Sequence, residues 1–361
     1  MSIPPYIEQY YQEALELLSN LIQMPSLSGE EEGTAAIIEA FLEAKEISFE
    51  RSGNNIWAKN VHYSPSKPTI LLNSHHDTVK PNAGYTHDPF EAIIKDDKLF
   101  GLGSNDAGGC LVSLILTFVH FHGEELPYNL ILAATAEEEN SGKNGVESIL
   151  EHIRPIEFGM VGEPTEMSMA VAEKGLLVLD CSAKGASGHA ARDVGVNAIY
   201  EAIQDIEWFR NHSFEKESDY LGPIKMTVTM VNAGYQHNVI PDTCDLVVDI
   251  RTTDAYTNKE VFEIVKSNIK SEVTARSFRL NSSHLPDHMA VAKAADELGI
   301  KKFGSPTCSD QAVMDFPTFK MGPGKSERSH TADEFLYLKE LEQGIHGYIQ
   351  LLETLFKQEK S

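Results

Sequence analysis

The chain has 361 residues, 42% of them apolar, and this length favours two domains because it exceeds what one hydrophobic core usually fills. Its formal net charge of −24 opposes binding to nucleic-acid phosphates and to anionic membranes. Without a leader-like start or an apolar stretch of membrane length, and with four scattered cysteines, it is predicted to be a soluble cytoplasmic protein.

The first part of the chain is predicted to begin with two helices. Apolar residues recur at helical spacing over 14–22 and stop before Pro25, which predicts the first helix. Ser28 and Glu31 have the spacing of a capping box ahead of the apolar run 35–42, and this pattern predicts that the second helix starts at Ser28.

Buried strands and another helix follow. Residues 69–73 and 129–134 are apolar runs bounded by turn residues and predict strands, with a helix over 111–121 between them. Alternation of this kind predicts an α/β domain with a mostly parallel sheet and flanking helices.

From about residue 167 the predicted order changes to βαββαβ, the split βαβ or ferredoxin-like arrangement. Helical spacing returns at 289–298 and 341–355, so the last segment is expected to rejoin the first domain. We therefore predict a catalytic domain of residues 1–167 and 287–361 and an inserted α+β domain of residues 168–286. The inserted elements are predicted as strands 176–183, 224–231, 244–251 and 272–280 and helices 197–211 and 258–269.

The segment LLNSHHDTV carries the strongest candidate metal ligand. Side chains alternate along a strand, so His75 and Asp77 share one face while His76 points away. A metal-bound imidazole usually donates its second N–H to a carboxylate or carbonyl oxygen. This pattern predicts His75 as a ligand and Asp77 as its supporting acid. The alternative is a polar pair at the protein surface.

The segment GLGSNDAGG places Asp106 among glycines, just ahead of the apolar helix. One interpretation is a helix cap, because a carboxylate is stabilised by the free N–H groups at a helix start. The glycines also permit the close backbone approach that a carboxylate between two cations requires. No Gly-Lys-Ser or Gly-Lys-Thr follows, so a phosphate-binding loop is excluded.

Acidic residues also follow two further predicted strands. Glu137, Glu138 and Glu139 come directly after a buried strand, and GMVGEPT delivers Glu163 in the same way. A run of acids is usually a solvated surface, but open α/β sheets place their sites at the carboxyl ends of strands. One carboxylate can then bind metal while its neighbour accepts a proton. His330 follows a glycine turn in MGPGKSERSHTADE.

Together these motifs supply two imidazoles and several carboxylates, a ligand set that suits Zn²⁺, with Co²⁺ or Mn²⁺ able to replace it in vitro. One tetrahedral ion needs at most four ligands, whereas two ions that share a carboxylate use five. We therefore predict two Zn²⁺ per chain.

The segments HHDTV, GLGSNDAGG, TAEEE, GEPT and GPGKSERSHTADE, in this order, resemble the metalloaminoacylase family of acetylornithine deacetylase, succinyl-diaminopimelate desuccinylase and carboxypeptidase G. The resemblance covers essentially the whole chain. It implies that one ion is bound by His75 and Glu163, that the other is bound by Glu139 and His330, and that Asp106 bridges them.

The same resemblance implies the residues that handle the proton. Glu138 falls on the general base, which accepts a proton from the water between the two ions and later protonates the leaving amine. Asp77 falls on the acid that orients His75. The family's usual Asp-Glu-Glu is Glu137-Glu138-Glu139 here, so a shift of these roles by one residue is left open.

The inserted domain carries the segments GASGHAA, HNVIPD, DIRTTD and AEKG. The resemblance implies that this domain forms a homodimer and that His189 and Asn238 reach the partner's active site. His189 then stabilises the oxyanion, while Arg251 and Lys174 hold the substrate carboxylate. The alternative for His189 is an ordinary loop residue; the functional role is favoured because the catalytic-domain motifs contain no oxyanion donor.

Within that family the sequence looks most like acetylornithine deacetylase. The predicted reaction is the hydrolysis of N-acetyl-L-ornithine, or of acetyl- or succinyl-citrulline, in arginine biosynthesis. Alternatives are a succinyl-diaminopimelate desuccinylase, a dipeptidase of the same fold, and a catalytically silent metal-binding scaffold. The presence of Glu138 beside five candidate ligands argues against the scaffold.

Overall fold

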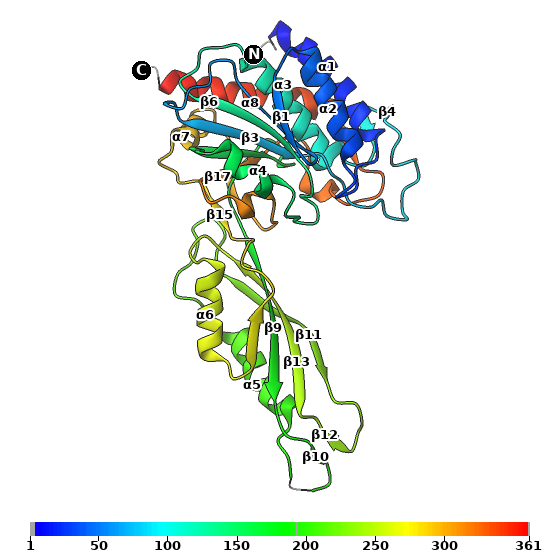
Figure 1. The fold of residues 1–361 in the computed structure, drawn as a ribbon, viewed down its shortest axis with the longest axis vertical. Coiled ribbons are helices and arrows are strands. Elements are labelled where there is room, and N and C mark those ends of the chain that lie inside the picture. Colours follow the sequence, from blue (N-terminus) through cyan, green and yellow to red (C-terminus); the bar gives the residue numbers. More distant parts are fainter. Residues whose placement is uncertain (1–3, 193, 360–361) are drawn as a thin grey trace. The chain divides into compact units, whose positions relative to one another are not determined.

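The computed structural model describes residues 4–192 and 194–359 (Figure 1). The chain divides into two compact units. Unit 1 comprises Met1–Val171, Leu285–Phe303 and Ser309–Ser361, and unit 2 comprises Ala172–His284 and Gly304–Cys308. The short segment Gly304–Cys308, which the sequence interpretation assigned to the catalytic domain, therefore clusters with unit 2.

Unit 1 is built on a mixed sheet whose centre is parallel. Its strands follow the order β1-β2-β6-β3-β7-β17-β8, with the short strands β15 and β16 at the β8 edge. The pairs β6/β3, β3/β7 and β7/β17 are parallel. The predicted α/β class is confirmed. The strands of this sheet are β1 (Phe49–Ser52), β2 (Asn55–Lys59), β3 (Thr69–His75), β6 (Asn129–Thr135), β7 (Phe158–Gly162), β8 (Met169–Glu173), β15 (Ser283–His284), β16 (Lys302–Ser305) and β17 (Thr318–Met321). β15 pairs with Ala172 and Glu173 of β8, and these residues all belong to unit 2.

Helices cover the sheet of unit 1. Helix α3 contacts β3 and β6 and is itself covered by α1 and α8, so nearly all of its side chains are buried (Figure 1). Helix α4 packs with Leu71 and Ile131. The helices are α1 (Pro5–Ile22), α2 (Glu32–Ala44), α3 (Gly109–Phe121), α4 (Val146–Ile153), α7 (Ala290–Glu297) and α8 (Leu338–Gln358).

Unit 1 also contains a small antiparallel sheet and three short helical segments. The small sheet has the order β18-β5-β4. Among the described residues no helix is long and apolar enough to cross a membrane. The segments are β4 (Ile93–Lys95), β5 (Lys98–Phe100), β18 (Phe335–Tyr337), η1 (Ser104–Gly108), η2 (Asp310–Val313) and η3 (Ser326–Arg328).

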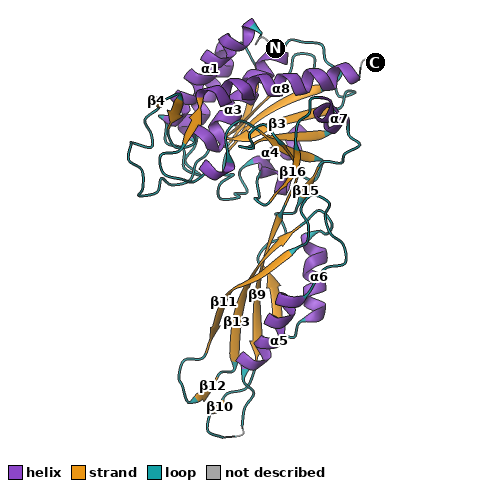
Figure 2. Cartoon of the chain, turned by 180° about the vertical axis from the view of Figure 1, so that it is seen from behind, coloured by secondary structure: helices purple, strands orange, loops and turns teal. Residues whose placement is uncertain are grey.

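Unit 2 has the predicted βαββαβ order. Its four antiparallel strands follow the order β11-β13-β9-β14, and Figure 2 shows α5 and α6 on one side of them. The predicted last strand is shorter than expected, because β14 pairs with β9 only over Glu272–Ala275. The elements are β9 (Gly175–Lys184), β10 (Gly188–His189), α5 (Ala198–Asn211), β11 (Lys225–Ala233), β12 (Val239–Ile240), β13 (Thr243–Thr252), α6 (Asn258–Asn268) and β14 (Glu272–Ala275).

The predicted capping box at the start of the second helix is wrong. Helix α2 begins at Glu32, and its N-cap residue makes no side-chain hydrogen bond to the helix. The Ser28 hydroxyl instead donates to Asp77 Oδ2 at 2.7 Å. The Glu31 carboxylate, 1% exposed, accepts from the backbone N–H of Gly29 at 2.5 Å. Tertiary and turn contacts have therefore taken the place of the local cap.

Candidate metal centre

The predicted ligands of unit 1 come from separate elements that meet at one end of the parallel strands. His75 is the last residue of β3, Glu138 and Glu139 follow β6, and Glu163 follows β7. Asp106 lies in η1, before α3. Because parallel strands all point the same way, their carboxyl ends share one edge of the sheet, which is where open α/β sheets place their sites.

Asp106 lies between the two predicted histidine ligands. Its Oδ1 is 3.5 Å from His75 Nε2, and its Oδ2 is 3.6 Å from His330 Nε2. Glu163 Oε1 lies 3.8 Å from His75 Nε2, and Glu139 Oε2 lies 2.9 Å from His330 Nε2. Each carboxylate oxygen of Asp106 thus faces a different imidazole, with one further acid beside each imidazole. The structure brings the five predicted ligands together; their coordination of metal stays a prediction.

The buried atoms of this cluster fit divalent cations. His75 Nε2 is buried and has no hydrogen-bond partner among the described residues. One candidate ligand atom from each of His75, Asp106 and Glu139 lies within 4.8 Å of the others, and the same holds for His75, Glu138 and Glu163. An unpaired imidazole nitrogen facing carboxylate oxygens is the donor set that zinc prefers. These residues therefore fit a metal centre.

The raised pKa values of the clustered acids also favour a metal centre. Burial, and then the nearby charge of Asp106, raise the pKa of Glu163 to about 8. Burial also raises the pKa of Glu138 well above its usual value, with further contributions from Glu163 and Asp310. Several acids packed together out of water disfavour their charged forms. Cations bound among them would relieve that repulsion.

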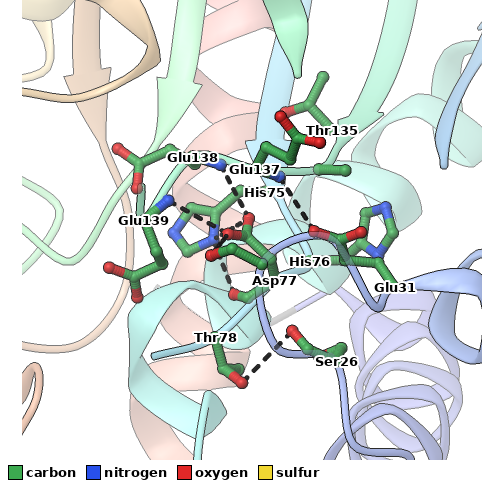
Figure 3. A network of polar contacts seen from close by, with 12 residues as sticks. Ser26, Glu31, His75, His76, Asp77, Thr78, Thr135, Glu137, Glu138 and Glu139 are labelled. Carbon is green, nitrogen blue, oxygen red and sulfur yellow. Dashed lines mark hydrogen bonds and ion pairs between the residues drawn. The ribbon is translucent and has the colours of Figure 1, made fainter. Parts of the chain in front are cut away.

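Asp77 supports two parts of the centre, as Figure 3 shows. Its carboxylate accepts hydrogen bonds from the backbone N–H groups of Glu138 and Glu139, each at 3.1 Å. His75 Nδ1 lies 3.0 Å from the backbone oxygen of Asp77 and 3.4 Å from its Oδ1. His75 Nδ1 is thus nearer to the backbone oxygen of Asp77 than to its carboxylate, and the role of Asp77 in orienting His75 stays a prediction. The Asp77 carboxylate also holds the acidic turn after β6, which the sequence did not indicate.

The three consecutive acids have different environments. The Glu137 carboxylate accepts from the backbone N–H of Asn144 at 3.2 Å and from its Nδ2 at 2.9 Å. The Glu137 N–H donates to Glu31 Oε1 at 3.2 Å (Figure 3). Glu138 and Glu139, by contrast, place oxygens within the ligand clusters. Glu137 therefore contacts a neighbouring turn, and the roles of Glu138 and Glu139 stay predictions.

Sequence reasoning gave no role at the centre to three buried acids that lie around it. Glu31 is one of them, and it holds the backbone of Glu137. Asp310, 8% exposed, accepts from the hydroxyl of Thr135 at 2.9 Å, and burial raises its pKa to about 6. Glu334 is the third, and it binds the backbone around Asp106. The available signal was slight: Glu334 stands inside a quoted segment, four residues after His330.

In unit 2 the structure brings His189 and Asn238 together. His189, in β10, lies opposite Val239 of β12. The backbone N–H of Ala190 donates to the backbone oxygen of Asn238 at 3.0 Å. The His189 side chain is exposed, and its Nδ1 accepts from the N–H of Ala191 at 3.1 Å. The two residues thus lie near each other on a two-stranded ribbon, and their proposed roles stay a prediction.

Arg251 and Lys174 form the second group in unit 2. Arg251 is near the end of β13, opposite Leu176, and Lys174 immediately precedes β9. Arg251 already donates to Asp249 from Nε at 2.9 Å and from Nη2 at 3.1 Å. His189 follows the other end of β9, a ten-residue strand about 30 Å long. The four predicted residues of unit 2 therefore form two separate pairs.

Comparisons with known proteins indicate the family of this chain. The model of Peptidase family M20/M25/M40 matches residues 71–354. Acetylornithine deacetylase of Proteus mirabilis is 28% identical, and the match covers 100% of this chain and 99% of that protein. Succinyl-diaminopimelate desuccinylase of Acidiphilium cryptum is 25% identical over 70% of this chain and 71% of its own.

Among solved structures, a dinuclear metal-binding peptidase of the M20 family from Bacillus subtilis has the same fold. It aligns with a TM-score of 0.72 at 18% identity and covers 97% of this chain and 99% of its own. The resemblance predicted from the five sequence segments is thus confirmed at the level of the family.

Proposed function

This chain belongs to Peptidase family M20/M25/M40, a family of metallohydrolases, and on that premise we propose that it hydrolyses the amide bond of an N-acyl amino acid. The proposed substrate is N-acetyl-L-ornithine, or acetyl- or succinyl-citrulline, and the products are the free amino acid and a carboxylate. The name of the 28% identical Proteus mirabilis protein supports an amino-acid deacetylase. The proposed setting is arginine biosynthesis in the cytoplasm.

One observation carries the hydrolytic part of this proposal: Asp106 presents one oxygen to His75 and the other to His330. We propose that His75 and Glu163 hold one Zn²⁺, that Glu139 and His330 hold the other, and that Asp106 bridges them. Co²⁺ is expected to substitute. Such ions, when bound, polarise a carbonyl and lower the pKa of water.

The proposed role of Glu138 follows from its place in the cluster. It has an oxygen near His75 and Glu163, and burial raises its pKa. A carboxylate close to both the water and the leaving nitrogen can accept a proton from the one and donate it to the other. Glu138 would take a proton from the attacking water as the oxygen bonds to the carbonyl carbon. It would then pass that proton to the nitrogen as the carbon–nitrogen bond breaks.

We propose that unit 2 pairs with unit 2 of a second copy and that His189 completes the partner's site. Strand β11 is at the edge of the four-stranded sheet, and it exposes Met230 and Val231, each 53% exposed. An edge strand with exposed apolar side chains favours pairing with another chain. Asn238 and His189 would then contact the partner's substrate, while Arg251 and Lys174 would bind a substrate carboxylate.

A substrate screen tests this function. Metal-free protein is loaded with Zn²⁺ or Co²⁺ and offered N-acetylornithine, acetyl- and succinyl-citrulline, succinyl-diaminopimelate and dipeptides, and amine release is measured. Preference for the acetyl and succinyl amino acids of the ornithine and citrulline series is expected. Preference for succinyl-diaminopimelate or for dipeptides would replace the proposed substrate and retain the metal chemistry. Absence of hydrolysis from a protein that binds two ions would favour a silent scaffold.

A further inference from the structure

A buried carboxylate outside the predicted ligand set lies behind Asp106. Glu334 is 2% exposed, and its Oε1 accepts from the backbone N–H of Asn105 at 2.8 Å and of Asp106 at 2.9 Å. Its Oε2 accepts from the N–H of Gly103 at 3.3 Å. Three backbone amides of one short loop thus converge on a single side chain, although Glu334 is 228 residues away from Asp106 in the sequence.

We propose that Glu334 is a positioning residue of the metal centre: it fixes the backbone of the Asp106 loop and so aims the two oxygens of Asp106 at the two ions. This inference rests on the proposed two-metal function. Glu334 touches neither ion nor substrate in this arrangement. Its effect is transmitted through the N–H of Asp106 itself, and therefore through the residue that the two predicted metal sites share.

The conformation of the loop explains why such a support is needed. Asp106 has φ −118° and ψ 98°, which are not helical values, so this stretch does not continue the backbone of α3. Buried N–H groups outside regular structure need other acceptors. A carboxylate provides stronger, charge-assisted hydrogen bonds than a neutral side chain. Two oxygens that satisfy three amides restrict the loop more than three unrelated acceptors would.

The place of Glu334 also connects it with metal binding, because one of the N–H groups that it accepts from belongs to Asp106, the residue proposed to bridge the two ions. Groups that orient metal ligands are typically worth about 10- to 100-fold in metal affinity.

Unit 2 contains a matched control for a purely structural role. Asp205 is 3% exposed and accepts from the backbone N–H of Lys270 at 3.0 Å and of Ser271 at 2.9 Å. It therefore has the same kind of buried carboxylate-to-backbone support, applied to a segment without a predicted ligand. D205N should lower the melting temperature and leave metal affinity unchanged.

The test compares wild type, E334Q and D205N by titration of the metal-free proteins with Co²⁺ alone, followed by visible absorption. The amide of E334Q is isosteric, but it is neutral and adds a donor that faces backbone donors. We expect Co²⁺ affinity to fall by about 10- to 100-fold in E334Q. Hydrogen exchange of the metal-free protein should show faster exchange at residues 103–106. D205N should match wild type in both measurements.

Equal Co²⁺ affinity in wild type and E334Q would overturn this inference and leave the proposed function standing. A wild-type protein that binds no Co²⁺ would overturn the proposed function, and this inference with it. If E334Q does not fold, E334D takes its place, because its shorter carboxylate cannot reach all three amides. Its affinity should fall about tenfold, and an unchanged affinity in E334D would also contradict the proposal.

Discussion

Several candidate residues of unit 1 are more buried than those of unit 2, although His330 of unit 1 is exposed. In unit 1, His75 and Asp77 are each 1% exposed, and the ligand segments are held from behind by further buried acids. In unit 2, His189 is exposed on a two-stranded ribbon, and Arg251 is paired with Asp249 on the open face of the sheet. The geometry of a buried cluster whose members contact one another is fixed within its own chain. The position of an exposed side chain depends on the substrate or the second chain that it contacts.

This difference matches the two kinds of contribution that we propose for the reaction. A metal centre needs fixed ligands, because small errors in position are costly in affinity and rate. Groups that bind a substrate or an oxyanion can be brought to the site by a conformational change or by a second chain. We therefore expect changes in unit 1 to alter metal content or the chemical step, and changes in unit 2 to leave the metals in place.

Metal removal should have the largest effect. Wild-type protein is expected to contain two divalent ions per chain by elemental analysis, and chelation should abolish hydrolysis until Zn²⁺ or Co²⁺ is restored. Because the buried acids of unit 1 repel one another without cations, metal addition should also raise the melting temperature. Full activity after exhaustive chelation would contradict the metal centre.

Substitution of Glu138, the proposed general base, should have the second largest effect on activity. Glu138→Gln is expected to lower kcat by about two to four orders of magnitude, the usual share of general acid and base catalysis, and to retain both ions. Glu137→Gln is the control, because its carboxylate binds Asn144 outside the cluster. If Glu138→Gln loses a metal ion and Glu137→Gln loses the rate, Glu137 is the base and Glu138 the ligand, so the roles are shifted by one residue.

The exposed His189 gives the third prediction, which tests whether unit 2 acts across chains. His189→Ala should lower kcat by about two to three orders of magnitude, the typical cost of losing one oxyanion donor, and keep both ions. Mixing it with inactive Glu138→Gln under subunit exchange should restore activity, because a mixed dimer has one site with both groups. No recovery despite demonstrated exchange would exclude a contribution from the partner chain.

Much of the fold could be predicted because its determinants are local. Apolar runs indicate the buried strands, and apolar residues at a period of 3.6 indicate the helices. Three of the candidate ligands, His75, Glu139 and Glu163, lie at or just after strand ends that the sequence marks clearly. The supporting acids could not be predicted, because their partners are remote: Glu31 and Glu137 are 106 residues apart. The capping box failed for the same reason, since Ser28 bonds to Asp77, 49 residues away.

The smallest predicted effect concerns Arg251, whose proposed role is to bind the substrate carboxylate. Loss of a charged hydrogen bond costs about 1.5–3 kcal/mol, so Arg251→Ala should raise KM by about 10- to 100-fold. kcat and metal content should change little, because Arg251 would bind the substrate carboxylate equally strongly in the ground state and in the transition state. Steady-state kinetics on metal-loaded protein measures both constants.

Unit 2 offers a matched control for this change. Arg276 donates to Asp180 from Nε at 2.9 Å and from Nη2 at 2.8 Å, an ion pair like that of Arg251 with Asp249. Both arginines are partly exposed, so each pair should contribute little to stability. If Arg276→Ala raises KM as much as Arg251→Ala does, the effect comes from the charge of unit 2 as a whole. A rise in KM confined to Arg251 would instead show that this partly exposed arginine of unit 2 recognises the substrate.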